Sequence, residues 1–220
     1  MKISFVRREK LAPGIWQYWY KPERPVDFVP GQYADFHILT PLSDPRGQSR
    51  TFTLTSQPRE STVSFVVKLA KPLSLYKATL QTLKVGDKMR LDEAMGDLVL
   101  PKATNMPLVF AAGGIGIASY ISSANYLKSN PEQRPIKLFY CLRNSDEQIF
   151  HDCFTLFHTS VIIAPNRLTV KQLLADQTDQ TLYYLSGSQK FVEGLQTGLE
   201  ASSIPRERIV FDYYDGYADL

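Results

Sequence analysis

Three glycines, at positions 113, 114 and 116, follow an apolar run of strand length and precede a stretch with helical spacing of apolar residues. Where a strand turns directly into a helix, the helix N-terminus presents unpaired N–H groups and a partial positive charge. Glycines at such a turn let a phosphate group approach the backbone. The segment Gly113-Gly114-Ile115-Gly116 is therefore a candidate phosphate-binding turn. It lacks the G-x-G-x-x-G spacing of the dinucleotide fingerprint, so taken alone it fits an ordinary strand–helix turn equally well.

The sequence around this turn alternates between strand and helix patterns. Strands are expected at Leu108–Ala112, Ile136–Leu142, Ser160–Ala164, Thr181–Leu185 and Arg208–Phe211. Helices are expected at Ile117–Ser129, Glu147–Phe157, Val170–Asp176 and Gln189–Ala201. Five strands with intervening helices predict a doubly wound parallel sheet, in which ligands bind at the carboxyl ends of the strands. The glycine turn follows the first of these strands, and this position favours the phosphate-binding interpretation.

The first hundred residues have a different, β-rich pattern. Strands are expected at Lys2–Arg7, Ile15–Tyr20, Tyr33–Leu39, Arg50–Thr55, Val63–Leu69 and Lys88–Leu91. One stretch, from Ser74 to Leu83, instead has apolar residues at helical spacing, with Ser74 as a possible cap. Six short strands predict a small closed barrel or sandwich. We therefore expect two domains, a β domain over residues 1–101 and an α/β domain over residues 102–220.

The bulk composition excludes several classes of function. The chain has 220 residues and a net charge of only +3, with no run of basic residues of the kind that binds nucleic acid. Its two cysteines, Cys141 and Cys153, are too few for an iron–sulfur cluster or a closed zinc site, and its three histidines are scattered, so no metal is expected. Reduced thiols in a cytoplasmic protein, without a membrane span or a signal peptide, are the expectation.

Several stretches, taken in order, resemble the ferredoxin–NADP reductase family, in which a flavin-binding barrel precedes a nicotinamide-dinucleotide domain. The first is Arg50-Thr51-Phe52-Thr53, which is similar to the flavin motif Arg-x-Tyr-Ser/Thr with phenylalanine in place of tyrosine. The resemblance implies a six-stranded antiparallel Greek-key barrel. It also implies that Arg50 binds the flavin phosphate, as a forked guanidinium can. Phe52 is then expected to stack on the flavin ring and Thr53 to lie near flavin N5.

Two further features of the barrel carry the same resemblance. The strand residues Val66, Val67 and Lys68 are similar to those whose backbone groups meet the edge of the flavin ring in the family. The glycine-rich turn that precedes the family's phosphate-binding helix is not present in Ala70-Lys71-Pro72-Leu73-Ser74. Ser74 and Thr79 therefore compete as the hydroxyl that meets the flavin phosphate. FAD is the expected flavin, with FMN as the less favoured alternative.

The second half of the chain resembles the family's nicotinamide-dinucleotide domain. The segment from Ala111 to Ala118 is similar to its pyrophosphate turn, and Ser119 stands where proline is common. Residues of the later strands then carry expected roles. The resemblance assigns nucleotide binding to Gly113, Gly114, Ile115, Gly116, Arg143 and Arg167, and a position beside the nicotinamide to Ser186 and Gly187. Asp212 and Tyr214, of the acidic–x–aromatic ending, are expected near the flavin, with Tyr217 behind Tyr214.

The function implied by the resemblance is transfer of hydride from NADPH or NADH to FAD, with electrons passing on to a separate acceptor. Thr53, Ser186, Asp212 and Tyr214 are the candidate catalytic residues. The expected acceptor is a small acidic electron-transfer protein such as a ferredoxin or flavodoxin, which suits the slightly basic chain. Two alternatives stay open: a reductase of free flavin or ferric chelates, and a non-catalytic nucleotide-binding subunit of a larger redox complex.

Overall fold

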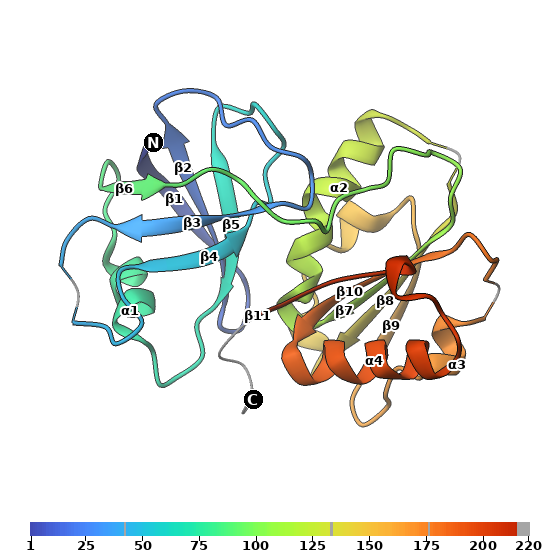
Figure 1. Ribbon diagram of the computed structural model, residues 1–220. Coiled ribbons are helices and arrows are strands. Elements are labelled where there is room, and N and C mark those ends of the chain that lie inside the picture. The colour runs from blue at the N-terminus through green and yellow to red at the C-terminus, as the bar shows by residue number, and fades with distance from the viewer. Residues whose placement is uncertain (42, 133, 176, 215–220) are drawn as a thin grey trace. The chain divides into compact units, whose positions relative to one another are not determined.

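A computed structural model describes residues 1–41, 43–132, 134–175 and 177–214 (Figure 1). The chain divides into two compact units, Met1–Val99 and Leu100–Leu220. The boundary thus falls two residues before the expected end of the first domain. Each unit contains one sheet, of six strands in the first and five in the second.

The first unit is an antiparallel six-stranded sheet, as the sequence predicts. Its strands are β1 (Lys2–Ala12), β2 (Ile15–Pro22), β3 (Tyr33–Ile38), β4 (Ser49–Thr53), β5 (Val63–Lys68) and β6 (Lys88–Leu91), in the spatial order β4-β3-β6-β1-β2-β5. The two outer strands are joined where the Thr55 N–H donates to the Ser64 carbonyl at 2.8 Å. This bond closes the sheet into a barrel.

Aromatic rings fill the interior of the barrel. Phe52 and Phe65 stack with their ring centroids 4.1 Å apart and their planes 4° from parallel. Phe36 meets Phe65 edge-on at 4.6 Å, and Tyr20 stacks on Phe65 at 5.7 Å. Such ring pairs contribute about 0.5–1.5 kcal/mol each beyond the area they bury. A β-strand turns alternate side chains inward, and this alternation brings the rings of four strands together.

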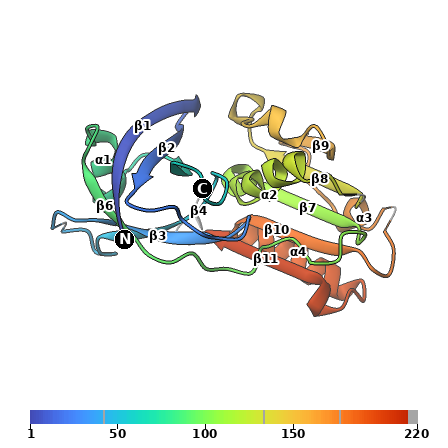
Figure 2. The same ribbon diagram turned by 90° about the horizontal axis from the view of Figure 1, so that it is seen from above.

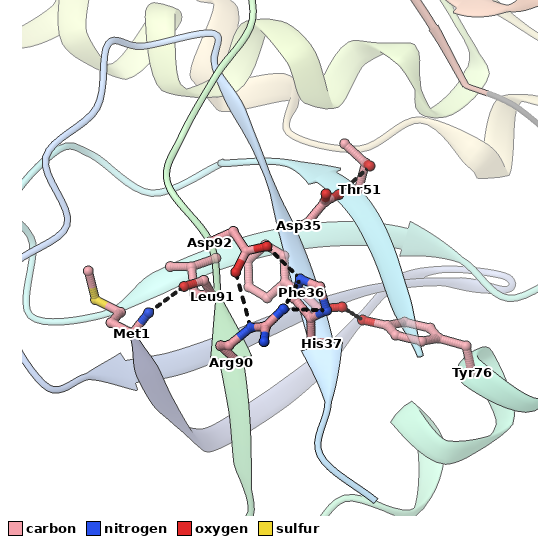
Figure 3. A network of polar contacts seen from close by, with 9 residues as sticks. All are labelled: Met1, Asp35, Phe36, His37, Thr51, Tyr76, Arg90, Leu91 and Asp92. Carbon is pink, nitrogen blue, oxygen red and sulfur yellow. Dashed lines mark hydrogen bonds and ion pairs between the residues drawn. The ribbon is translucent and has the colours of Figure 1, made fainter. Parts of the chain in front are cut away.

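One helix, α1 (Leu75–Thr82), packs against the barrel through Tyr76 and Leu80, which are fully buried. The hydroxyl of Ser74 caps its first turn by accepting the Lys77 N–H at 3.2 Å. The Tyr76 phenol donates to the carbonyl of Phe36 on β3 at 2.8 Å (Figure 3). Burial raises the pKa of this phenol far above its ordinary value, so Tyr76 acts only as a neutral donor.

The second unit is a parallel five-stranded sheet with helices on both faces (Figure 2). Its strands are β7 (Leu108–Gly113), β8 (Ile136–Leu142), β9 (His158–Ile163), β10 (Leu182–Ser188) and β11 (Ile209–Tyr214), in the order β11-β10-β7-β8-β9. On one face α2 (Ala118–Ser129) packs its Tyr120 ring on Phe110 of β7, with centroids 4.5 Å apart. On the other face α3 (Val170–Leu173) and α4 (Gln189–Ala201) cover Ala111 and Leu185. Within the described residues, no helix has the length and apolar character needed to cross a bilayer.

Local structure differs from the expected elements in several places. The helix expected over Glu147–Phe157 is replaced by two short 3₁₀ turns, Ser145–Glu147 and His151–Phe154. Phe150, between them, has φ 56° and ψ 31°, a left-handed conformation that ends a right-handed helix. A 3₁₀ turn, Gly114–Ile117, likewise precedes α2, and α3 ends at Leu173, while Asp176 lies outside the described residues. A further 3₁₀ turn, Arg206–Arg208, leads into β11, and β10 and β11 both extend three residues past their expected ends.

Candidate functional site

The strand order of the second unit defines where a ligand is expected. Strand β7 lies between β8, which follows it in the chain, and β10, which comes later, so the order reverses between β7 and β10. In open parallel sheets, ligands bind outside the carboxyl ends of the strands at this switch point. The glycine turn ends β7, and Ser186 and Gly187 lie in the last residues of β10. Both predicted segments therefore meet at the switch point.

Glycine is required at two positions of the turn, for two different structural reasons. A Cβ atom at Gly116 would lie 2.3 Å from the carbonyl oxygen of Ser186, so only glycine allows the turn to pass this close to the end of β10. Gly114 adopts φ +54°, which side chains disfavour, and a Cβ there would meet no atom within 4 Å among the described residues. The backbone at Gly114 thus faces open space beside the first turn leading into α2. A phosphate group requires such access.

A chain of three hydroxyl groups runs across the same edge of the sheet. The Ser119 Oγ of α2 lies 2.9 Å from the Ser186 Oγ of β10 and 2.9 Å from the Tyr214 hydroxyl of β11. Ser119 and Ser186 are buried. The sequence predicted roles for Ser186 and Tyr214 but not for Ser119. The available signal was a hydroxyl residue standing where proline is common in the family.

The other predicted residues of the second unit lie along this edge. Asp212 is paired in register with Ser186. Arg143 directly follows β8, and Arg167 lies four residues beyond β9; both side chains are exposed. Since β8 and β9 are adjacent and parallel, both arginines stand at the carboxyl side of the sheet. Tyr217 lies outside the described residues.

In the first unit, Arg50 is folded onto the loop before β4. Its Nη1 donates to the carbonyl oxygens of Arg46 and Gly47, each at 3.1 Å, and of Ser49 at 2.6 Å. Its Nη2 forms an ion pair with Oδ1 of Asp44 at 2.8 Å. The Nε atom is buried and has no hydrogen-bond partner among the described residues. A buried guanidinium with an unused donor is suited to an oxygen-rich anion.

Asp44, which the sequence did not single out, lies between Arg50 and the N-terminus of α1. Its Oδ2 accepts the Tyr76 N–H at 3.1 Å, and its Oδ1 accepts the Arg46 N–H at 3.0 Å. Its side chain is 3% exposed. Burial alone raises the pKa of Asp44, but the two N–H groups and the Arg50 guanidinium outweigh burial, so the net pKa is lowered. The carboxylate therefore stays charged and marks a position where an anion is stabilised.

Positive charges gather at the start of α1. Lys77, in the first turn of α1, is half-buried, and its ammonium group donates to the Lys68 carbonyl at 2.9 Å. Burial, and then the charges of Arg46 and Arg50, lower the pKa of Lys77 to about 8. Lys77 thus lies within electrostatic range of two arginines, one of which pairs with Asp44, and this cation cluster fits a phosphate group.

The remaining predicted barrel residues differ in how deeply their side chains are buried. Phe52 is 9% exposed and its ring stacks on Phe65 in the barrel core, so its stacking on the flavin ring stays a prediction. Thr53 is buried, whereas Thr51 is exposed and its hydroxyl donates to Asp35. Thr79 lies one turn into α1, with its hydroxyl donating to the Leu75 carbonyl at 2.9 Å. Ser74 is the helix N-cap, two residues before Tyr76, whose N–H donates to Asp44.

The β5 residues predicted to meet the flavin ring edge are paired with β2. Val66, Val67 and Lys68 pair with Gln17, Trp16 and Ile15 of β2. The Lys68 carbonyl also accepts the Lys77 ammonium group, as described above. This contact links the C-terminal end of β5 to the cation cluster at α1.

A further polar cluster lies on β3 and at the end of β6 (Figure 3). Ligand-type atoms of Asp35, His37 and Asp92 lie within 4.8 Å of one another. The Arg90 guanidinium donates to Asp92 at 3.1 Å and lies 3.1 Å from the His37 ring nitrogens. An arginine therefore supplies the positive charge that these groups attract.

Comparison with known proteins relates both units to redox proteins. No protein-family model matches the chain. The chain is 26% identical, over 88% of its length, to the reductase component of propane 2-monooxygenase from Mycolicibacterium smegmatis, and it spans 62% of the length of that relative. It superposes on a ferredoxin–NADP⁺ reductase from Neisseria gonorrhoeae, solved with bound FAD and NADP, with a TM-score of 0.80, 16% identity and coverage of 97% of this chain and 98% of the other.

A second solved structure extends the comparison. The FAD/NAD-binding domain of nitric oxide dioxygenase from Vibrio cholerae matches with a TM-score of 0.80 and 17% identity, covering 97% of this chain and 98% of that domain. At these identities the structural matches establish the fold, while the curated relative extends the relationship to the sequence. The shared architecture is a six-stranded antiparallel barrel followed by a five-stranded parallel sheet. In fold, the chain is similar to a ferredoxin–NADP⁺ reductase and to an FAD/NAD-binding domain, and in sequence it is similar to a monooxygenase reductase component.

Proposed function

We propose that this protein is an NAD(P)H-dependent flavoprotein reductase that passes electrons to a separate acceptor. The observation that carries the proposal is the glycine turn at the switch point, where Gly114 opens the backbone to a ligand beside Ser186. Dinucleotides bind at this position in doubly wound sheets. Bound FAD and NAD(P)H supply the hydride-transfer chemistry, and the protein supplies position and electrostatics.

The second unit is proposed to bind the nicotinamide dinucleotide. The N–H groups that begin at Gly114 and run into α2 would face the pyrophosphate. Arg143 and Arg167, exposed beyond β8 and β9, would meet the nucleotide end and favour NADPH over NADH. The hydroxyl of Ser186, held by Ser119, would orient the nicotinamide.

The first unit is proposed to bind FAD through the cation cluster at α1. Arg50 has a buried Nε without a partner among the described residues, and Lys77 adds a second positive charge beside the helix N-terminus. Ser74 caps the helix there. These groups fit the phosphates of FAD. Stacking of Phe52 on the flavin ring, expected from the sequence, stays part of this proposal.

The acceptor is proposed to be a small acidic electron-transfer protein or an oxygenase component. The relative from Mycolicibacterium smegmatis is a monooxygenase reductase component, and the net charge of +3 suits an acidic partner. Two cysteines cannot ligate a four-cysteine iron–sulfur cluster, and burial raises the pKa of the Cys141 thiol to about 12. Cys141 is therefore no thiolate relay at neutral pH. We propose the cytoplasm as the compartment, because it supplies NAD(P)H and keeps both thiols reduced.

The test is spectroscopic. The full chain is incubated with excess FAD, freed of unbound flavin, and mixed anaerobically with NADPH or NADH. The proposal expects a yellow protein whose flavin absorbance bleaches, faster with the preferred nicotinamide. A protein that takes up no flavin, or one whose bound flavin is not reduced by either nicotinamide, contradicts it.

A further inference from the structure

We propose that Asp44 is an internal competitor for the flavin phosphate, so that this protein holds its flavin as an exchangeable ligand. The inference rests on the proposed function, since it concerns the same FAD site. It assigns a role to a residue that lies outside the motif Arg50-Thr51-Phe52-Thr53.

The Asp44 carboxylate occupies both groups that would bind a phosphate. Asp44 Oδ1 pairs with Arg50 Nη2 at 2.8 Å, and Asp44 Oδ2 accepts the Tyr76 N–H of the α1 N-terminus at 3.1 Å. A phosphate oxygen at this position would need the same guanidinium and the same N–H. Both anions cannot be bound there together, because like charges at this spacing repel each other strongly in a buried place.

Asp44 satisfies the hydrogen-bond donors of the Arg50 guanidinium only in part. The Arg50 Nε keeps no hydrogen-bond partner among the described residues, and Nη2 meets Asp44 as an ion pair without hydrogen-bond geometry. The positive charges of Arg46 and Arg50 also act on Lys77, whose pKa is lowered by burial and by these two arginines. A phosphate, with more oxygens and more charge than a carboxylate, therefore remains able to displace Asp44 at a reduced net gain.

Asp44 belongs to a loop rather than to a strand. It lies between β3, which ends at Ile38, and β4, which begins at Ser49. Its own Oδ1 holds the Arg46 N–H, and its carbonyl accepts the Gly47 N–H at 2.9 Å. Withdrawal of the carboxylate needs rearrangement of this loop alone, not of the sheet.

The experiment compares wild type with Asp44→Asn, which keeps the size and one acceptor oxygen but removes the charge. Dissociation constants for FAD, FMN and riboflavin are measured on the apoprotein by quenching of flavin fluorescence. We expect Asp44→Asn to bind FAD and FMN about tenfold more tightly, the effect of one charge-assisted hydrogen bond. Riboflavin, which has no phosphate, should bind both proteins equally.

A second readout separates competition from a merely structural role. Urea unfolding of the apoprotein should show Asp44→Asn to be less stable than wild type, because the carboxylate caps α1 and holds the loop. Competition thus predicts lower apoprotein stability together with higher flavin affinity, whereas a structural role lowers both. Asp27→Asn is the matched control, since Asp27 forms an exposed pair with Arg59 in the same unit at 3.0 Å.

The outcomes are distinguishable. Equal or weaker FAD binding by Asp44→Asn, with wild type still binding FAD, overturns the competition and leaves the reductase proposal intact. A tenfold gain that extends to riboflavin also overturns it, because the gain would not involve the phosphate. Absence of binding of any flavin to either protein overturns both proposals.

Discussion

The hydroxyl groups of Ser119 and Tyr214, 95 residues apart in sequence, lie 2.9 Å from each other. Ser119 also contacts the Ser186 hydroxyl at 2.9 Å, so one helix residue joins the carboxyl ends of two adjacent strands. In the proposed site, Ser119 acts on the nicotinamide through the Ser186 hydroxyl that it contacts. We therefore regard it as a positioning residue for Ser186.

Replacement of Ser119 by alanine should loosen Ser186 and slow flavin reduction by NAD(P)H. The loss of a buried hydrogen bond should also lower the free energy of unfolding by about 1–2 kcal/mol. Stopped-flow absorbance measures the reduction rate, and the dependence of that rate on nicotinamide concentration separates binding from positioning. A lowered limiting rate with unchanged nicotinamide affinity is the expected pattern.

Ser123→Ala provides the control, because Ser123 is buried on the same helix but is not part of the hydroxyl chain. Tyr214→Phe removes one partner of Ser119 and keeps the aromatic ring, so it should have a smaller effect than Tyr214→Ala. If Ser119→Ala and Ser123→Ala reduce flavin at the same rate as wild type, Ser119 has no positioning role.

Arg50→Ala should lower the flavin content of the purified protein and weaken FAD binding at least tenfold, because a forked guanidinium and its charge are lost. Arg50→Lys should recover part of the affinity, since lysine restores the charge but not the fork. Equilibrium dialysis against FAD measures the change. Arg59→Ala, at an exposed position of the same unit, should leave FAD binding unchanged. Full flavin retention by Arg50→Ala would argue against the proposed flavin site.

Lys77 should make FAD binding depend on pH near 8. The ammonium group attracts the phosphate only while it is protonated, and burial with the nearby arginines lowers its pKa to about 8. FAD affinity should therefore fall as the pH rises from 7 to 9, and Lys77→Met should remove this dependence. Fluorescence titrations at each pH test it, with riboflavin as the ligand that should show no change. An identical pH profile for wild type and Lys77→Met would disprove the role.

The same lowered pKa has a consequence for the stability of the apoprotein. The folded-state pKa of about 8 lies below the ordinary lysine pKa of 10.5, so folding disfavours the charged form. This penalty is fully present below pH 8 and is relieved as the pH rises from 8 toward 10.5. Apo Lys77→Met should accordingly be more stable than wild type at pH 7, with the difference shrinking by pH 10. Urea midpoints at the two pH values test the sign.

Asp92 should stabilise the barrel at neutral pH but not in acid. Burial alone raises its pKa, but His37 at 2.7 Å and Arg90 lower it further than burial raises it (Figure 3). A carboxyl whose folded pKa lies below its unfolded pKa contributes stability above the unfolded value and loses it as the pH falls through the folded value. Asp92 is 38% exposed, so the contribution is at most about 1 kcal/mol.

Asp92→Asn should therefore be slightly less stable than wild type at pH 7, and the two proteins should converge as the pH falls below 3. Chemical unfolding at a series of pH values follows this convergence. Asp27→Asn should show a smaller difference at pH 7, because Asp27 is more exposed. A gap that widens in acid would mean that the His37–Asp92–Arg90 contacts do not stabilise the ionised carboxylate.

Much of the fold follows from local sequence patterns. Alternating apolar residues predict the strands of both sheets, and the glycine turn predicts the end of β7, because these features depend on neighbouring residues. The failed helix over 147–157 shows the limit of such patterns. Its apolar spacing is helical, yet Phe150 adopts a left-handed conformation that the spacing does not reveal.

The candidate sites were predictable only where a motif is continuous. Arg50 and Gly114 belong to short motifs, whereas Asp44 acquires its role by contact with Tyr76, 32 residues away, and Ser119 by contact with Ser186, 67 residues away. Phe52 illustrates a different limit. Its type suggests ring stacking, but strand geometry directs it toward Phe65 in the core, and only the packed barrel decides between these surroundings.

Tyr76 connects the interior of the barrel to its proposed anion site through a single residue. Its phenol is bonded to the Phe36 carbonyl, and its N–H is bonded to Asp44. The freshly synthesised chain can therefore seat α1 before any cofactor arrives, because Asp44 already supplies the negative charge that the helix end attracts. A change at Asp44 would therefore be transmitted through one residue to the β3 strand inside the barrel.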